Sequence, residues 1–137
     1  MKIPKFEAQT EWVKPTEFPD LRKVDEIAID LETRDPDLIK KGSGSIIGNG
    51  EVIGVAVATS NYKGYFPIAH EGGGNMDRKK VLDWLKDILE SSSTKIFHNA
   101  MYDVCWLKKM GFKINGDIVC TMIAAAVTDE NRFRYDL

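Results

Sequence analysis

The chain has 137 residues, of which 43% are hydrophobic and 29% charged, as in a single folded domain and unlike a disordered segment. Nineteen basic residues against 21 acidic ones give a net charge of −2, which excludes a protein that grips nucleic acid by bulk positive charge alone. No apolar run approaches the roughly 18 residues of a membrane helix and the N-terminus lacks a signal-peptide stretch, so we expect no membrane partner and a cytoplasmic protein, in the host cytoplasm if it is viral.

The first half of the chain predicts a lead-in and three strands. Residues 1–23 contain three of the five prolines and no hydrophobic period, so they are predicted to be an extended lead-in to a domain over residues 24–137. The first strand is expected in EIAIDLET, which stops before Asp35-Pro36. A Gly, Ser and Asn-rich turn, KKGSGSIIGNGE, comes next. A hairpin is then predicted from VIGVAVATS and YFPIA.

The second half alternates helices with strands. An amphipathic helix is predicted in MDRKKVLDWLKDILE, a short strand in KIFHNA, and a helix that ends at Gly111 in YDVCWLKKMG. A further short strand and helix are predicted in KINGDIVCTMIAAAV. Three adjacent strands followed by this alternation predict an α/β domain with a mixed sheet. The two cysteines, Cys105 and Cys120, are expected to be reduced and buried.

A pair of acids stands at the end of the first predicted strand. Asp30 and Glu32 are two residues apart, so on a strand their side chains point to the same side of the sheet. Hard cations such as Mg²⁺ or Mn²⁺ prefer oxygen ligands, and such a pair can flank them. The alternative is two solvated acids at a strand terminus. The apolar residues 27–29 indicate a central strand, which favours a function for the pair.

A second polar group, HNAMYD, lies where the fourth predicted strand meets a helix. Asn99 is expected near the helix N-cap and Asp103 in the first helical turn. The alternative is that Asn99 only caps the helix and Asp103 only complements its dipole. For His98 we expect a packed or hydrogen-bonded strand-end histidine, because hard cations prefer oxygen ligands.

These two motifs together resemble the first two motifs of the DnaQ-like, or DEDD, superfamily of 3′-5′ exonucleases. IDLET is similar to the first motif and HNAMYD to the second. The following DIVCTMIAAAVT resembles the small-residue helix of proofreading domains in family A DNA polymerases, so the resemblance spans about residues 24–128. It implies an RNase H-like mixed sheet, with three antiparallel strands and then parallel strands, flanked by helices.

The resemblance also implies an activity. Two Mg²⁺ or Mn²⁺ ions would hydrolyse the terminal phosphodiester of a DNA strand, releasing nucleoside monophosphates. Asp30 is implied to bridge the ions, Glu32 to bind the ion that holds the attacking water, and Asp103 to help hold the second. Thr33 and Asn99 are implied to contact the terminal nucleotide. The implied partners are a single-stranded DNA 3′ end and a polymerase domain, in cis or in trans.

One family feature is absent from these 137 residues. The third motif, Tyr-x-x-x-Asp or His-x-x-x-Asp, is not found, and Tyr135-Asp136-Leu137 resembles the loop that precedes it. We therefore expect a C-terminally incomplete domain, from a longer or a split protein. The choice between the DEDDy and DEDDh subclasses stays open, although overall similarity points to DEDDy.

Two other functions stay open beside proofreading. An RNase D-like or Werner-type exonuclease shares both motifs and differs in its substrate. A catalytically silent nucleic-acid-binding module with the same fold is the other alternative.

Overall fold

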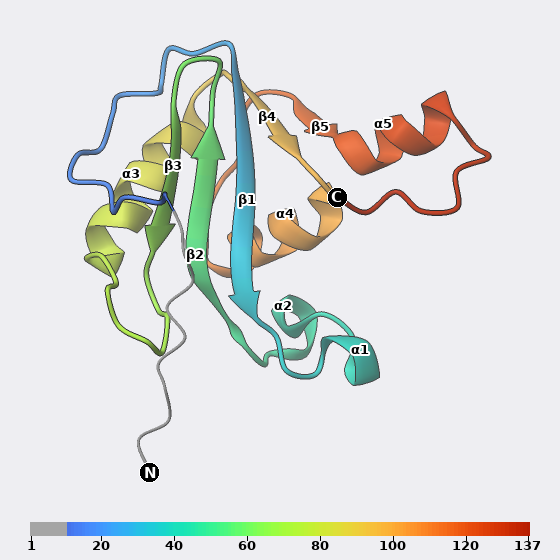
Figure 1. The fold of residues 1–137 in the computed structure, drawn as a ribbon, viewed down its shortest axis with the longest axis horizontal. Coiled ribbons are helices and arrows are strands. Elements are labelled where there is room, and N and C mark those ends of the chain that lie inside the picture. The colour runs from blue at the N-terminus through green and yellow to red at the C-terminus, as the bar shows by residue number, and fades with distance from the viewer. Residues whose placement is uncertain (1–10) are drawn as a thin grey trace.

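The computed structural model describes residues 11–137 and shows a five-stranded mixed sheet with helices packed on one face (Figure 1). The strand order is β3-β2-β1-β4-β5, in which β1, β2 and β3 are antiparallel and β1, β4 and β5 are parallel. This confirms the predicted mixed sheet with a central first strand. The strands are β1 Glu26–Arg34, β2 Glu51–Ala58, β3 Lys63–Pro67, β4 Thr94–Phe97 and β5 Ile118–Cys120.

The central strand β1 has one buried and one open side. Ile27, Ile29 and Leu31 are buried, whereas Asp30 and Glu32 are exposed on the opposite face, as strand parity predicts. The register of β1 against β2 shifts between Glu32 and Thr33. The residue skipped by the register is Ile53 on β2, so this β-bulge disrupts the ladder locally and bends β2 opposite the acidic pair.

Three helices follow the predicted order: α3 Arg78–Glu90, α4 Ala100–Lys109 and α5 Thr121–Thr128. Helix α3 begins at Arg78 because the Asp77 side chain accepts a hydrogen bond from the Lys80 amide, a standard N-cap. Helices α3 and α4 lie behind the sheet, and α5 projects to one side with no buried residue (Figure 1). Nowhere between residues 11 and 137 is a helix both long and apolar enough to span a membrane.

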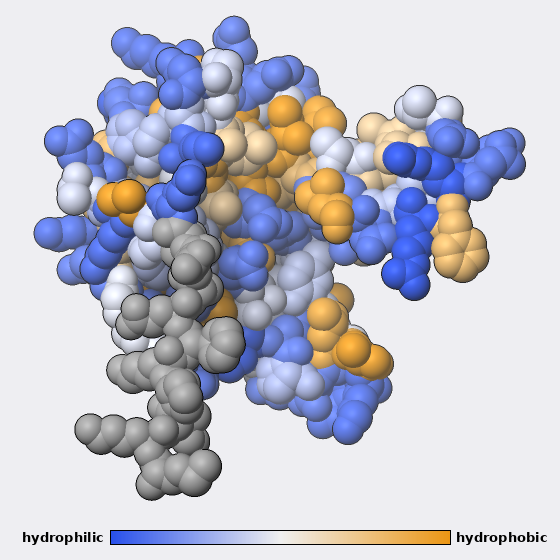
Figure 2. Space-filling view, in the orientation of Figure 1, coloured by the Kyte–Doolittle hydropathy of each residue, from blue (hydrophilic) through white to orange (hydrophobic). Residues whose placement is uncertain are grey.

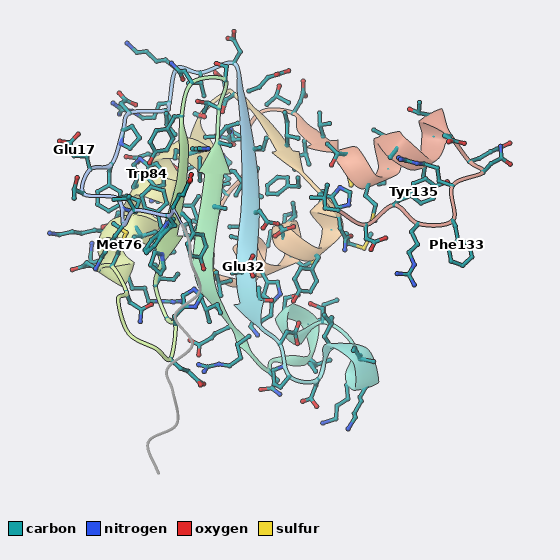
Figure 3. The ribbon with its side chains drawn as sticks, in the orientation of Figure 1. Glu17, Glu32, Met76, Trp84, Phe133 and Tyr135 are labelled. Carbon is teal, nitrogen blue, oxygen red and sulfur yellow. The ribbon has the colours of Figure 1, made fainter. Side chains whose placement is uncertain are left out.

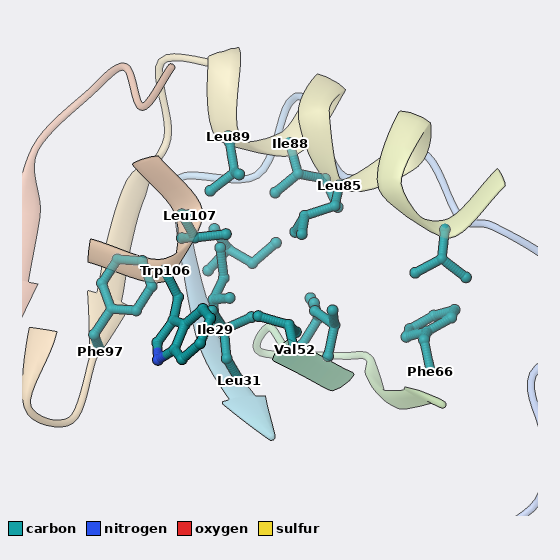
Figure 4. Packing of buried hydrophobic residues seen from close by; sticks show 14 of the residues in the cluster. Ile29, Leu31, Val52, Phe66, Leu85, Ile88, Leu89, Phe97, Trp106 and Leu107 are labelled. Carbon is teal, nitrogen blue, oxygen red and sulfur yellow. The ribbon is translucent and has the colours of Figure 1, made fainter. Parts of the chain in front are cut away.

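The core fills the space between the sheet and helices α3 and α4 (Figure 4). Leu85 and Leu89 from α3 and Trp106 from α4 meet the buried side of β1 and β2 there. The buried side of the sheet also holds Lys95 on β4, whose Nζ donates to the carbonyl oxygens of Ser91, Ser93 and Asn115. Burial lowers the pKa of Lys95, and these carbonyls replace its lost water.

Two single-turn helices stand where the sequence predicted only a turn. They are α1 Leu38–Lys41 and α2 Gly44–Ile47. The Ser43 hydroxyl accepts a hydrogen bond from the Ser45 amide and so caps α2. Gly42 and Gly48 end the two turns with positive φ angles of 98° and 83°. The glycines and serines that indicated a turn therefore act as helix ends.

The lead-in over residues 11–23 contains no helix or strand but packs against the domain; residues 1–10 lie outside the described part. Phe18 stacks on Phe66 at a centroid distance of 5.8 Å, and the Trp84 indole donates to the Pro19 carbonyl at 2.7 Å. Leu21 is 5% exposed and belongs to the core. The lead-in thus covers the edge strand β3, a common protection of an open sheet edge.

The two cysteines, Cys105 and Cys120, are free thiols as predicted. The expectation that they are buried is wrong, because both are only half-buried. Each lies on or beside a helix that is open to solvent on one side.

Candidate functional site

Three acidic residues lie near one another at the Leu31 position of β1. Asp30 and Glu32 flank this residue on the open face of β1, and Asp103 accepts a hydrogen bond from the Leu31 amide at 3.0 Å (Figure 3 shows Glu32). The pairing of β1 with β4 covers only Glu26 to Ala28, so the strands separate before Leu31. Asp103, in the first turn of α4, enters where the strands separate.

The three acids influence one another electrostatically. Asp103 is 3% exposed, and its pKa is raised to about 7. Burial is the main cause, the charges of Asp30 and Glu32 add to it, and the hydrogen bond from the Leu31 amide opposes it. Burial also raises the pKa of Asp30, opposed by His98. Among residues 11–137 no Lys or Arg forms an ion pair with any of the three. Carboxylates held together without a basic partner favour a bound cation.

The donor set fits a hard divalent cation. All three side chains offer carboxylate oxygens, which Mg²⁺ and Mn²⁺ prefer. The ligands are not preassembled, however: within the described chain no group of three or more His, Cys, Asp or Glu residues is arranged to hold an ion. Asp103 instead directs an oxygen at the Leu31 amide.

The two predicted substrate contacts have different surroundings. The Thr33 hydroxyl lies 2.8 Å from the Tyr102 hydroxyl and is half-buried. Asn99 is exposed at the N-cap of α4 with a φ of 61°, the one non-glycine residue with positive φ in residues 11–137. Its side chain makes no capping hydrogen bond, so the alternative that Asn99 serves as a side-chain cap is wrong. The alternative that Asp103 only complements the helix dipole also conflicts with its burial.

His98 is hydrogen-bonded at the end of β4, as predicted. The Thr121 hydroxyl donates to the Phe97 carbonyl at 3.2 Å, so it accepts from His98 Nδ1, 2.9 Å away. Within the described chain the buried Nε2 has no hydrogen-bond partner.

Two tyrosines at the site were missed by the sequence analysis. Tyr65 on β3 lies near the acids. Its pKa is raised mainly by burial and further by the charges of Glu32 and Asp30. A Cβ on Gly54 would approach the Tyr65 hydroxyl to 2.0 Å, so this glycine makes room for the tyrosine. Gly54 within a strand was the available signal. Tyr102 precedes Asp103 in its motif, but nothing in the sequence indicated its hydrogen bonds.

A groove of about 880 Å³ runs over the open face of the sheet beside Asp30. Its floor is apolar, and Figure 2 shows apolar surface over this part of the sheet. Polar groups stand at its margin, including His98 and two lysines from the lead-in and β3. The residues that line it include Ala28, Ala56, Ile96, Tyr65, Lys14 and Lys63.

Comparison with known protein sequences places these features in a family. Residues 16–136 match the 3′-5′ exonuclease family. A DNA-directed DNA polymerase of Pseudomonas phage M6 is 41% identical over 81 residues, which cover 56% of this chain and 12% of the polymerase. The DNA polymerase DpoZ of Salmonella phage PMBT28 is 30% identical over 122 residues, covering 88% of this chain and 17% of the relative. The chain therefore spans less than a fifth of these relatives.

Solved structures share the fold. Brucella melitensis NrnC with bound Mg²⁺ has a TM-score of 0.58 at 23% identity, over 86% of this chain and 52% of that one. The structure of Pol1 from M. smegmatis with DNA primer-template has a TM-score of 0.59 at 12% identity, over 91% of this chain and 20% of that one. These likenesses confirm the predicted RNase H-like exonuclease fold.

Proposed function

The chain belongs to the 3′-5′ exonuclease family, as a DEDD-type domain similar to the proofreading domains of family A DNA polymerases, and on this premise we propose that it proofreads for a DNA polymerase. It hydrolyses the last phosphodiester at a single-stranded DNA 3′ end and releases a nucleoside monophosphate. The observation that carries the proposal is that Asp30 and Glu32 lie close enough to Asp103 to raise its pKa, while no Lys or Arg of residues 11–137 forms an ion pair with any of the three.

In this proposal the three carboxylates hold divalent cations. Asp30, Glu32 and Asp103 would hold two Mg²⁺ or Mn²⁺ ions, with Asp30 serving both, Glu32 the first and Asp103 the second. Such ions lower the pKa of a bound water and stabilise the leaving oxygen. Asp103 has to lose its proton to become a ligand, so ion binding releases a proton when the pH is near or below its pKa of about 7.

The groove beside Asp30 is proposed to receive the DNA strand. Its apolar floor suits sugars and bases, while Lys14 and Lys63 at its margin suit phosphates. Thr33 and Asn99 are proposed to contact the terminal nucleotide. The phage relatives are polymerases, which supports a polymerase domain as the partner, in cis or in trans, and a role in the cytoplasm of a host cell.

The test is Asp30→Asn in the complete polymerase that contains this chain. We expect mononucleotide release from a 3′-labelled single strand to fall by at least about 100-fold, because a ligand charge is lost while the side-chain volume is kept. Asp83→Asn, at an exposed position on α3, is the matched control and keeps full activity. An Asp30→Asn enzyme with normal rate and Mg²⁺ dependence would remove Asp30 from the site.

A second substrate is favoured by one comparison. Brucella melitensis NrnC bound to pGG shares the fold with a TM-score of 0.58 at 22% identity. An RNase-type activity on short oligonucleotides is therefore the alternative. Degradation of DNA and RNA strands of the same sequence and length separates the two, since a proofreading enzyme prefers the DNA strand.

A further inference from the structure

Helix α4 presents a row of three side chains toward the end of β1 and the α1–α2 segment (residues 38–47). Tyr102, Trp106 and Lys109 recur at the spacing of one helix face. The Tyr102 ring packs edge-on against Trp106 at 6.5 Å, and the Lys109 ammonium lies 5.0 Å from the Trp106 ring centre. This row is adjacent to Asp103, because Tyr102 and Asp103 are consecutive.

The Tyr102 hydroxyl joins two residues that follow Glu32. It donates to Asp35 Oδ2 at 2.9 Å and lies 2.8 Å from Thr33 Oγ1. A tyrosine has one hydroxyl proton, which here goes to the Asp35 carboxylate, so Thr33 is the donor to Tyr102. The hydrogen bonds therefore run from Thr33 through Tyr102 to Asp35, and all three hydroxyl and carboxylate groups are satisfied.

Asp35 connects Tyr102 to helix α2 by a further hydrogen bond. Both of its carboxylate oxygens accept from the Gly44 amide, at 3.1 and 2.9 Å. The Gly44 carbonyl in turn accepts from Lys109 Nζ at 2.8 Å. Both the amide and the carbonyl of Gly44, the first residue of α2, are thus hydrogen-bonded to groups that α4 holds in place.

Glu32 lies in the middle of the stretch that α4 holds. Leu31 is held by Asp103, and Thr33 and Asp35 are held by Tyr102. The sheet fixes this stretch on one side only, because β1 pairs with β2 as far as Arg34 whereas its pairing with β4 ends at Ala28. On the side that faces α4, side-chain hydrogen bonds take the place of backbone pairing with a neighbouring strand.

We propose that Tyr102 is a positioning residue for Glu32: its hydroxyl fixes the end of β1 so that the Glu32 carboxylate points at the cation site. The proposal rests on the proposed function, in which Glu32 binds the ion that holds the attacking water. Groups that orient a metal ligand commonly contribute 10–100-fold to metal affinity or activity. Tyr102 touches no reacting atom and acts through Thr33 and Asp35.

The test compares Tyr102→Phe with the wild type in the complete polymerase. This change removes the hydroxyl and keeps the ring against Trp106, so the fold is retained. We expect kcat for single-strand hydrolysis to fall about 10–100-fold, KM for the strand to stay within about twofold, and the Mn²⁺ concentration for half-maximal rate to rise. Tyr135→Phe is the matched control, because it also removes a tyrosine hydroxyl, which donates to the Asp129 carbonyl, and Tyr135 lies beyond α5, away from Glu32 (Figure 3).

Two readouts do not depend on activity. Without metal, amide hydrogen exchange at residues 31–35 and 44–48 should be faster in Tyr102→Phe than in the wild type or Tyr135→Phe. Calorimetric titration with Mn²⁺ alone should show weaker binding. Thr33→Val removes the other end of the same hydrogen bond, so its effect and that of Tyr102→Phe should be less than additive.

The outcomes distinguish a failure of the positioning role of Tyr102 from a failure of the proposed exonuclease function. Unchanged kcat, exchange and Mn²⁺ affinity in Tyr102→Phe would overturn the positioning role, as would a loss of stability with normal metal dependence. A wild-type polymerase that cleaves neither DNA nor RNA strands would overturn the proposed function instead. In that case exchange and Mn²⁺ binding still decide whether Tyr102 orders the end of β1 and its cation site.

Discussion

At the scale of single residues, Asp103 couples the stability of the domain to pH. Its pKa is about 7 in the folded chain and 3.8 as an unperturbed carboxyl group. Between these values the folded state binds more protons than the unfolded state, so stability falls as the pH rises from about 4 to about 7. The stabilising effect of the protonated form is lost above that window, unless a cation compensates the charge.

We therefore predict that Asp103→Asn stabilises the metal-free domain at pH 8 and much less at pH 5. The asparagine keeps an oxygen acceptor for the Leu31 amide and removes the charge. Each pKa unit corresponds to about 1.4 kcal/mol, and solvent screening reduces this, so we expect a gain of about 1–2 kcal/mol at pH 8. Urea unfolding in EDTA at the two pH values measures it. A gain that is equal at both would show that Asp103 does not titrate in this window.

Single-residue predictions succeeded where they depended on local geometry. Strand parity placed Asp30 and Glu32 on one face, and the helix start placed Asp103 in the first turn. Tyr102 and Tyr65 could not be found in this way. Their partners are brought close by tertiary structure: Tyr102 contacts Asp35 across a separation of 67 residues, which no local pattern encodes.

At the scale of elements, all five strands and the three longer helices followed from hydrophobic period and turn residues. The short helices α1 and α2 did not, because four residues each are too few to display a helical period. Helix α2 is held by tertiary hydrogen bonds: the Gly44 amide donates to Asp35, and the Gly44 carbonyl accepts from Lys109. Local sequence therefore predicted a turn at a place where contacts with α4 impose helical turns.

Gly44 is the position at which this segment is most sensitive to substitution. A Cβ there would come within 1.7 Å of the Asn49 carbonyl oxygen and 2.8 Å of Asp35 Oδ1. We predict that Gly44→Ala destabilises the domain by at least about 2 kcal/mol or displaces α2, because backbone atoms cannot yield easily. Gly72→Ala, with nothing within 4 Å of its Cβ, is the control and should stay within about 0.5 kcal/mol. Urea unfolding of both variants tests this, and equal stabilities would contradict the crowding at Gly44.

At the scale of the whole molecule, the domain is one-sided. Helices α3 and α4 cover one face of the sheet, while the face that carries Asp30 and Glu32 borders a groove of about 880 Å³ (Figures 1 and 2). Within residues 11–137 the carboxylates are adjacent but not arranged as a closed metal site. The described chain thus presents the three acids beside an open groove.

We predict that the 137 residues on their own cleave a single strand at least about 100-fold more slowly than the complete polymerase. Mg²⁺ demands near-octahedral geometry, and positioning contributes a large part of a rate, so an open ligand set reduces catalysis more than binding. Supplying a helix with Tyr-x-x-x-Asp or His-x-x-x-Asp, in cis or as a peptide, should raise the rate. Release of mononucleotides from a 3′-labelled strand measures both; robust cleavage by the 137 residues alone would show that three carboxylates suffice.

The strand order also determines when the acids meet during folding. The antiparallel β1–β2–β3 unit joins neighbours in sequence, whereas β4 reaches β1 only through a parallel pairing such as Glu26 with Thr94. Local pairings form faster than distant ones, because less chain entropy is lost in closing the loop. Asp30 and Glu32 belong to the early unit and Asp103 to the late one. A chain still being synthesised therefore carries two acids without their third partner, and we expect it to acquire any nuclease activity only in the last step of its folding.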